Sequence, residues 1–118
     1  MLVVEDEARE DAVVVRAKGE IDSSTVEELA SRLAGALQQA AAHPARLVVI
    51  DLQPVTFFGS AALNAVLDCH EEAKEAGTSV ALVADHDQVL RPIQVTELDR
   101  ILDIYPTLPD ALRRKPQR

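Results

Sequence analysis

One stretch, residues 47–67, constrains the fold more than any other part of the chain. It begins with the apolar, mostly β-branched run 47–50, which is typical of a strand buried on both faces. Gln53-Pro54 ends that run, and the small residues 59–62 then open a helical pattern. A strand that leads through a tight corner into a helix leaves free backbone N–H groups at an exposed position. This corner is therefore the first candidate for a functional surface.

Apolar periodicity and turn residues predict the elements on either side of this stretch. Before it, we expect strands over 2–4 and 13–19, joined as a hairpin by an acidic loop, and a helix over 26–41. Ser24 and Glu27 have the spacing of a capping box for that helix. After the stretch, we expect a helix that ends at Gly77, a strand over 80–84, a short or kinked helix around Pro92, a strand over 100–104 and a helix over 107–112 capped by Thr107.

Length, charge and this order of elements define the fold class. The chain has 118 residues, enough for one core, so we predict a single domain over 1–118 with a flexible basic tail at 113–118. Strands separated by helices require crossover connections and parallel pairing. The prediction is an α/β domain: a mixed, mostly parallel sheet of four to five strands with an N-terminal hairpin and four helices.

The composition argues against several classes of partner and several cellular locations. The net charge of −8 is unsuited to nucleic acid, because binding phosphates requires clustered Lys and Arg. No stretch approaches the roughly 18 apolar residues of a membrane span. The N-terminus becomes acidic at once and lacks the pattern of a signal peptide, so we expect a cytoplasmic protein that binds neither nucleic acid nor membrane.

Residues that could carry catalysis or bind a metal are dispersed. His43, His70 and His86 have no partner at metal-ligand spacing, and Cys69 is the only cysteine. The four glycines form no phosphate loop, and Ser60 lacks the surroundings of a nucleophile elbow. We therefore expect no catalytic residue, no metal and no cofactor. Ser60 itself is interpreted as a helix N-cap or as an exposed hydroxyl for a partner or kinase.

Three segments together carry a family resemblance. They are Gly-Glu-Ile-Asp at 19–22, Val-Ile-Asp-Leu at 49–52 with Val-Thr-Phe-Phe-Gly-Ser-Ala-Ala-Leu at 55–63, and the ending formed by 96–102 and 108–112. Their order and spacing resemble the STAS domain, and more narrowly the bacterial anti-sigma factor antagonists. The resemblance implies that the partner is an anti-sigma factor that is also a serine kinase of the histidine-kinase-like ATPase type. It also implies that the unphosphorylated antagonist binds this anti-sigma factor and so frees a sigma factor.

The resemblance also implies a phosphorylation switch, from which this chain departs. The family's loop reads Asp-Ser-Ser/Thr-Gly, and here its positions hold Gly59, Ser60, Ala61 and Ala62. Ala61 stands where the family has the phosphoacceptor, and it has no hydroxyl. Ser60 is a possible substitute acceptor, but one position along a helix turns a side chain by about 100°. We expect a binder that the usual kinase reaction does not switch off.

A partner surface is predicted around the two helix starts. Its predicted residues are Asp22, Ser23, Ser24, Phe58, Gly59, Ser60, Ala61, Ala62 and Asn64. A bulky charged residue in place of Ser60 or Ala62 is expected to abolish binding without unfolding the chain. The protein is expected to be a monomer or a weak homodimer. Two alternatives stay open: an interaction module of another signalling or lipid-transport assembly, and a small-molecule or nucleotide sensor.

Overall fold

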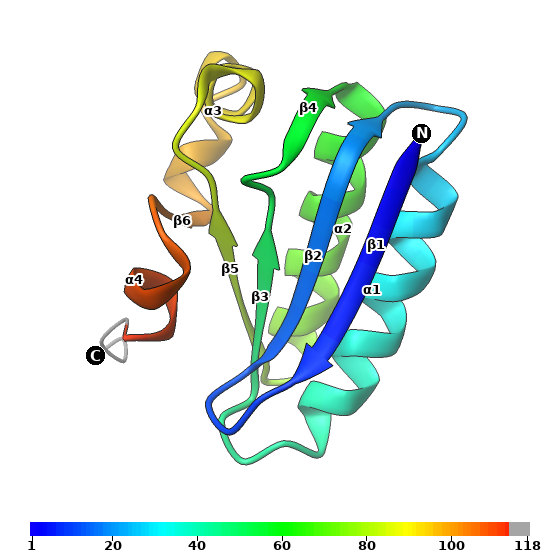
Figure 1. Ribbon diagram of the computed structural model, residues 1–118. Helices are drawn as coiled ribbons and strands as arrows, with labels where there is room; N and C mark the ends of the chain where they lie inside the picture. Colours follow the sequence, from blue (N-terminus) through cyan, green and yellow to red (C-terminus); the bar gives the residue numbers. More distant parts are fainter. Residues whose placement is uncertain (114–118) are drawn as a thin grey trace.

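The computed structural model describes residues 1–113 as one twisted sheet with helices on both faces (Figure 1). The strands are β1 (Leu2–Ala8), β2 (Val13–Ile21), β3 (Leu47–Asp51), β4 (Val55–Phe58), β5 (Ser79–Val83) and β6 (Asp103–Tyr105). The helices are α1 (Val26–Ala41), α2 (Ser60–Glu75), α3 (Asp87–Val95) and α4 (Leu108–Leu112), with a short 3₁₀ helix, η1 (Leu98–Arg100). The predicted fold class is confirmed. Of the predicted basic tail, residues 114–118 lie outside the described part.

The sheet has one strand more than predicted. Its order is β1-β2-β3-β5-β6, with β1 antiparallel to β2 and the other pairs parallel. The additional strand, β4, pairs with the end of β2, while β3 pairs with its beginning. Residues 52–54 thus interrupt what would otherwise be one long strand beside β2 (Figure 1). The sequence pattern did not predict β4, because its two central residues, Thr56 and Phe57, are both exposed and break the alternation of a half-buried strand.

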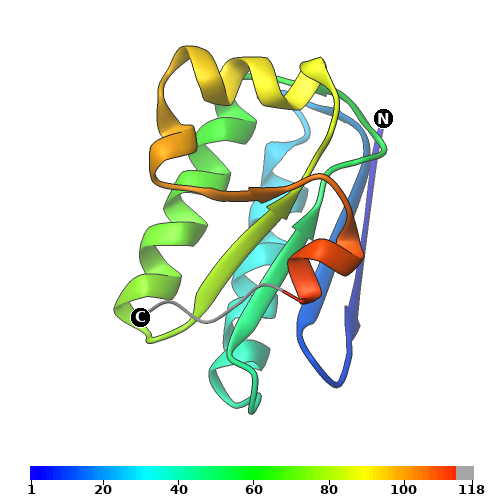
Figure 2. The same ribbon diagram turned by 90° about the vertical axis from the view of Figure 1, so that its left-hand side faces the viewer.

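Two hydrophobic clusters lie on opposite faces of the sheet. On one face, α1 and α2 bury apolar residues such as Leu29, Leu33 and Val66 against the strands. On the other face, Ala111 of α4 packs with a smaller cluster that includes Val49 (Figure 2). The central strand β3 is buried along its whole length, as its apolar run predicts. The larger cluster includes Ile21 and Phe58 at the carboxyl ends of β2 and β4, and the chain enters α1 and α2 from these ends.

Turn chemistry sets the ends of several elements. Gly77, with a φ of +74°, follows α2 as predicted. His43 lies in the turn after α1, whose C-cap is Ala42: its Nδ1 accepts the N–H of Ala45 at 3.0 Å, and its Nε2 lies 2.6 Å from the carbonyl oxygen of Arg9 in the hairpin loop. The helix α3 is short, as predicted, yet it runs through Pro92 without interruption. The last strand begins at Asp103, later than predicted, because η1 and the turn that follows it occupy residues 98–102.

Candidate functional site

The starts of α1 and α2 lie side by side because the strands that lead into them are paired. Ile21 at the end of β2 pairs with Phe58 at the end of β4, and the N–H of Gly59 donates to the carbonyl oxygen of Ile21 at 3.1 Å. After Ile21 the chain enters α1 through residues 22–25, and it enters α2 directly after Gly59. The Asp22 loop (residues 22–25) and the α2 corner (residues 59–62) therefore form one surface at this edge of the sheet.

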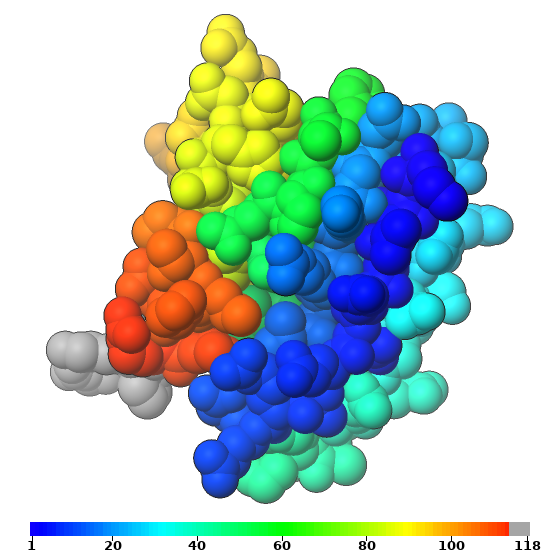
Figure 3. All heavy atoms as spheres, in the orientation of Figure 1, coloured from blue at the N-terminus to red at the C-terminus, as the bar shows by residue number. Residues whose placement is uncertain are grey.

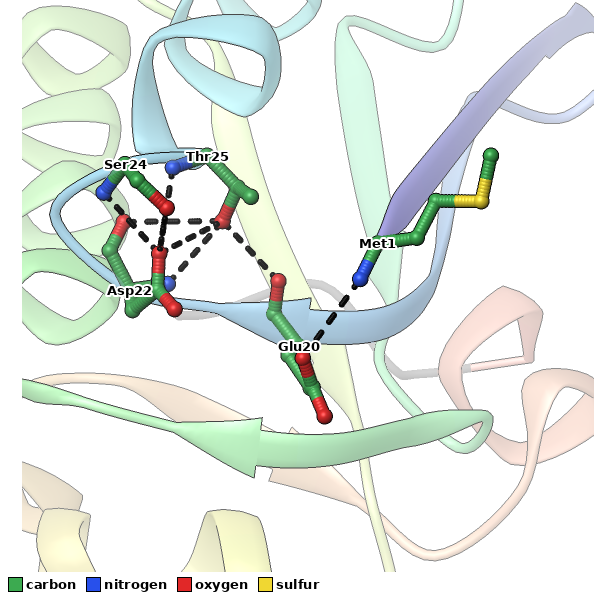
Figure 4. A network of polar contacts seen from close by, with 5 residues as sticks. All are labelled: Met1, Glu20, Asp22, Ser24 and Thr25. Carbon is green, nitrogen blue, oxygen red and sulfur yellow. Dashed lines mark hydrogen bonds and ion pairs between the residues drawn. The ribbon is translucent and has the colours of Figure 1, made fainter.

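The carboxylate of Asp22 organises the Asp22 loop (Figure 4). Its Oδ1 accepts the Ser24 N–H at 2.9 Å, the Ser24 hydroxyl at 2.6 Å and the Thr25 N–H at 3.2 Å. The hydroxyl of Thr25 accepts the Asp22 N–H at 3.0 Å and donates to the carbonyl oxygen of Glu20 at 2.9 Å. These bonds, those from Ser24 first, hold the pKa of Asp22 below its ordinary value of 3.8. The loop is thus held in shape with a charged carboxylate at its centre.

The predicted capping box at the start of α1 is wrong. Thr25, not Ser24, is the N-cap residue, and no side chain caps the helix. The physical reason is that the Ser24 hydroxyl donates to Asp22 instead of accepting a helix N–H. Asp22, interpreted from the sequence alone only as a residue ahead of the cap or near a partner surface, takes over the loop's backbone N–H groups.

The interpretation of Ser60 as an N-cap is also wrong. The N-cap of α2 is Gly59, in an extended conformation, and Ser60 is the first residue inside the helix. No side chain caps α2, and its first turn contains no acidic residue. The α2 corner therefore presents an exposed serine hydroxyl and small side chains beside the positive end of a 16-residue helix.

The nine residues of the predicted partner surface differ in their exposure to solvent. Seven of its nine residues are exposed or half-buried; they are Asp22, Ser23, Ser24, Gly59, Ser60, Ala61 and Asn64. Phe58 and Ala62 are only 3% and 0% exposed, so neither side chain can lie on a surface. A charged residue at Ala62 would therefore unfold the core, which corrects the expectation that the chain would tolerate it.

The sequence prediction missed Phe57, which is 51% exposed. Successive residues in a strand point to opposite faces, so one of two adjacent phenylalanines is expected to point outward. Assigning residues 55–58 to a strand would have provided that signal. The exposed ring belongs to the same edge of the sheet as the α2 corner.

Two grooves flank the α2 corner, and consecutive residues line different ones. The first, which we call the α3 groove, lies between β4, the start of α2 and α3; it measures 530 Å³ and is lined by Phe57, Ser60, Leu63, Arg91, Pro92 and Val95 among others. The second, the α1–α2 groove, measures 470 Å³ and is lined by Ala30, Ala34, Ala61, Asn64, Asp68 and Glu72 among others. Ser60 thus faces α3, whereas Ala61 faces α1.

Metal-ligand clusters and a reactive thiol are both absent from the described residues. Residues 1–113 hold no group of three or more histidine, cysteine or acidic side chains arranged for a metal. Cys69 is buried, and burial, with a smaller contribution from Glu72, raises the pKa of its thiol to about 12. A thiol with this pKa is a poor nucleophile. Within the same residues, every helix is too short or too polar to cross a membrane.

Comparisons with known proteins agree with this architecture. The family description of the STAS domain matches residues 4–111. An anti-sigma factor antagonist from Mycobacterium paratuberculosis is 31% identical, with a TM-score of 0.86 over 95% of this chain and 92% of that one. An anti-sigma-factor antagonist (STAS) domain protein from Planctomyces limnophilus is 26% identical, with a TM-score of 0.74 over 92% and 93%. SpoIIAA of Bacillus, an anti-sigma factor antagonist solved unphosphorylated, is 20% identical and shares the fold, with a TM-score of 0.74 over 93% of each chain.

Proposed function

The chain belongs to the STAS domain family, and we propose that it is an anti-sigma factor antagonist whose partner binds at the two helix starts. In this proposal it is a single-domain binding protein of the cytoplasm, not an enzyme. The observation that carries the proposal is the surface formed by the Asp22 loop and the α2 corner. The 31% identity to the mycobacterial antagonist, over nearly the whole of both chains, supports it.

The partner in this proposal is an anti-sigma factor of the serine-kinase type. It contacts the exposed residues of both loops, including Ser23, Ser24, Ser60 and Asn64, together with the ring of Phe57. The Asp22 carboxylate supports this surface by fixing the shape of its loop. A small, uncapped helix start next to a rigid loop lets another backbone approach closely.

The same proposal makes the antagonist constitutive. Phosphorylation would add about −1.5 to −2 charges at the binding surface, which is enough to disrupt an interface. Ala61 has no oxygen to accept a phosphoryl group. Ser60 has one, but its side chain lines the α3 groove and not the α1–α2 groove, where Ala61 lies. The anti-sigma factor would therefore stay bound to this antagonist until another protein displaces it or one of the two is degraded.

Capture from native lysate tests the proposed partner. The purified chain is the bait, with Ser60→Arg as the disrupting variant and Gln39→Arg, exposed near the other end of α1, as the matched control. We expect the wild type and Gln39→Arg to retain a kinase-type anti-sigma factor, identified by mass spectrometry, and Ser60→Arg to lose it. Retention of a lipid-transport component in its place, or equal retention by both variants, would contradict the proposal.

A further inference from the structure

The α3 groove combines apolar walls with a single cationic side chain. Phe57 and Val95 are 51% and 74% exposed, although most large apolar side chains of the described residues are buried. Leu63 and Pro92 continue the same apolar lining. Figure 3 shows α3 beside β4 at one end of the molecule. Exposed apolar side chains gathered in a hollow indicate a binding site.

Arg91 is the cation of this groove. No described acidic side chain lies within ion-pair distance of its guanidinium, whereas several other arginines, such as Arg32 and Arg113, have such partners. Asp87 lines the same groove one helical turn earlier, and it forms no ion pair with Arg91 either. An unpaired cation in a chain with a net charge of −8 leaves one place in this groove where an anionic group is favoured.

We propose that the α3 groove binds a small amphiphilic anion, an aliphatic chain with one carboxylate, with the carboxylate against Arg91. The 530 Å³ groove falls within the roughly 300–1,000 Å³ typical of small-molecule sites. The aliphatic chain would cover Phe57 and Val95, whose exposure to water is otherwise unfavourable. The exposed surface of this lining is mainly apolar, which favours an aliphatic chain over the polar base and sugar of a nucleotide. This site does not depend on the proposed function, although Phe57 and Ser60 belong to both surfaces.

Titration with sodium decanoate, kept below its micelle concentration, tests the site. We expect saturable shifts in the amide resonances of Phe57, Ser60, Arg91 and Val95 in the ¹⁵N-labelled full chain. Decyltrimethylammonium is the matched ligand, with the same chain and a cationic head, and we expect it to bind more weakly. Non-saturable or scattered shifts, equal binding of the two ligands, or stronger binding of GTP at these amides would each overturn the proposal.

Variants measure separately what the charge of Arg91 and the apolar contact of Val95 contribute to decanoate binding. Arg91→Gln is expected to weaken decanoate binding about fivefold, as for an exposed ion pair, and Val95→Ser to weaken it as well. Asp87→Asn removes a negative charge of the groove lining that would repel the ligand carboxylate, and it is expected to tighten binding. Arg100→Gln, on η1 outside the groove, is the control and leaves binding unchanged. An Arg91→Gln protein that keeps its melting temperature and binds decanoate as tightly as the wild type would refute the assignment.

Discussion

Ser60 and Ala61 are consecutive residues at the start of α2, yet their side chains line different grooves. Ser60 lines the α3 groove, and Ala61 lines the α1–α2 groove. The rotation of about 100° between successive helical residues accounts for the separation. A hydroxyl at position 60 is therefore directed away from the place where a hydroxyl at position 61 would be.

The two phenylalanines of β4 are expected to differ sharply in their contribution to stability. Phe58→Ala removes a side chain that is 3% exposed, so it should lower the free energy of unfolding by about 3 kcal/mol. Phe57→Ala removes a ring that is half exposed and should lower it by less than about 1 kcal/mol. Urea denaturation of both variants measures the difference. Equal losses would mean that β4 is oriented differently.

Two glycines provide a matched pair with opposite expected effects. Gly19 has a φ of +113°, and a Cβ there would overlap the carbonyl oxygen of Met1, so Gly19→Ala should destabilise the chain by about 1–2 kcal/mol. The φ strain remains even if the N-terminus moves aside. Gly35 lies on the exposed face of α1 with open space around it, and Gly35→Ala should stabilise the chain by about 0.5–1 kcal/mol. Thermal unfolding that shows the same sign for both variants would contradict this account.

The Asp22 loop predicts a pH-dependent contribution to stability. Since its hydrogen bonds hold the folded pKa of Asp22 below 3.8, the unfolded chain binds the proton more tightly. The stabilisation is therefore complete above about pH 4 to 5 and is lost as the pH falls through the lowered folded pKa. We expect Asp22→Ala to melt below the wild type at pH 7 and the gap to narrow in acid.

Ser23→Ala is the control for this experiment, because Ser23 is exposed in the same loop and carries no titratable group. Its melting temperature should follow that of the wild type across the pH range. A gap between Asp22→Ala and the wild type that stays constant into strong acid would show that the charge of Asp22 does not hold the loop.

The thiol of Cys69 is expected to be unreactive in the folded chain. Its pKa of about 12, raised by burial, leaves almost no thiolate at pH 8. Iodoacetamide should modify the native wild type slowly and the urea-unfolded chain quickly. Ser31→Cys, exposed on α1, adds a second thiol that should react quickly in the native state. If Cys69 in the native chain reacts as fast as the thiol introduced at position 31, α2 opens readily.

The sequence determined the order of elements well, because each has a strong local signal. The apolar run of β3 and the apolar spacing of α1 predict a buried strand and an amphipathic helix, and both are found. The cap of α4 is also local: the hydroxyl of Thr107 accepts the N–H of Asp110 at 3.2 Å. What could not be predicted was β4, because its exposed residues 56 and 57 lack the alternation of a half-buried strand, so that no local signal marks it.

The details of the candidate site depended on tertiary structure in the same way. The motifs that carry the family resemblance predict one surface for the Asp22 loop and the α2 corner, and the pairing of Ile21 with Phe58 brings the two loops close together. These motifs could not show that the Ser24 hydroxyl bonds to Asp22 instead of capping α1. Nor could they show that Phe57 is exposed and Phe58 buried, which follows only once residues 55–58 are known to form a strand.

The most direct test of a constitutive antagonist is the intact mass of the chain after incubation with the captured kinase-type partner and Mg-ATP. Ala61→Ser places a hydroxyl where the family resemblance puts the phosphoacceptor, and Ser60→Ala with Ala61→Ser leaves it as the only side-chain hydroxyl of residues 59–62. The account predicts that the wild type keeps its mass while both variants gain one phosphoryl group. A phosphorylated wild type that loses the phosphate in Ser60→Ala would contradict it, and so would an Ala61→Ser chain that stays unmodified.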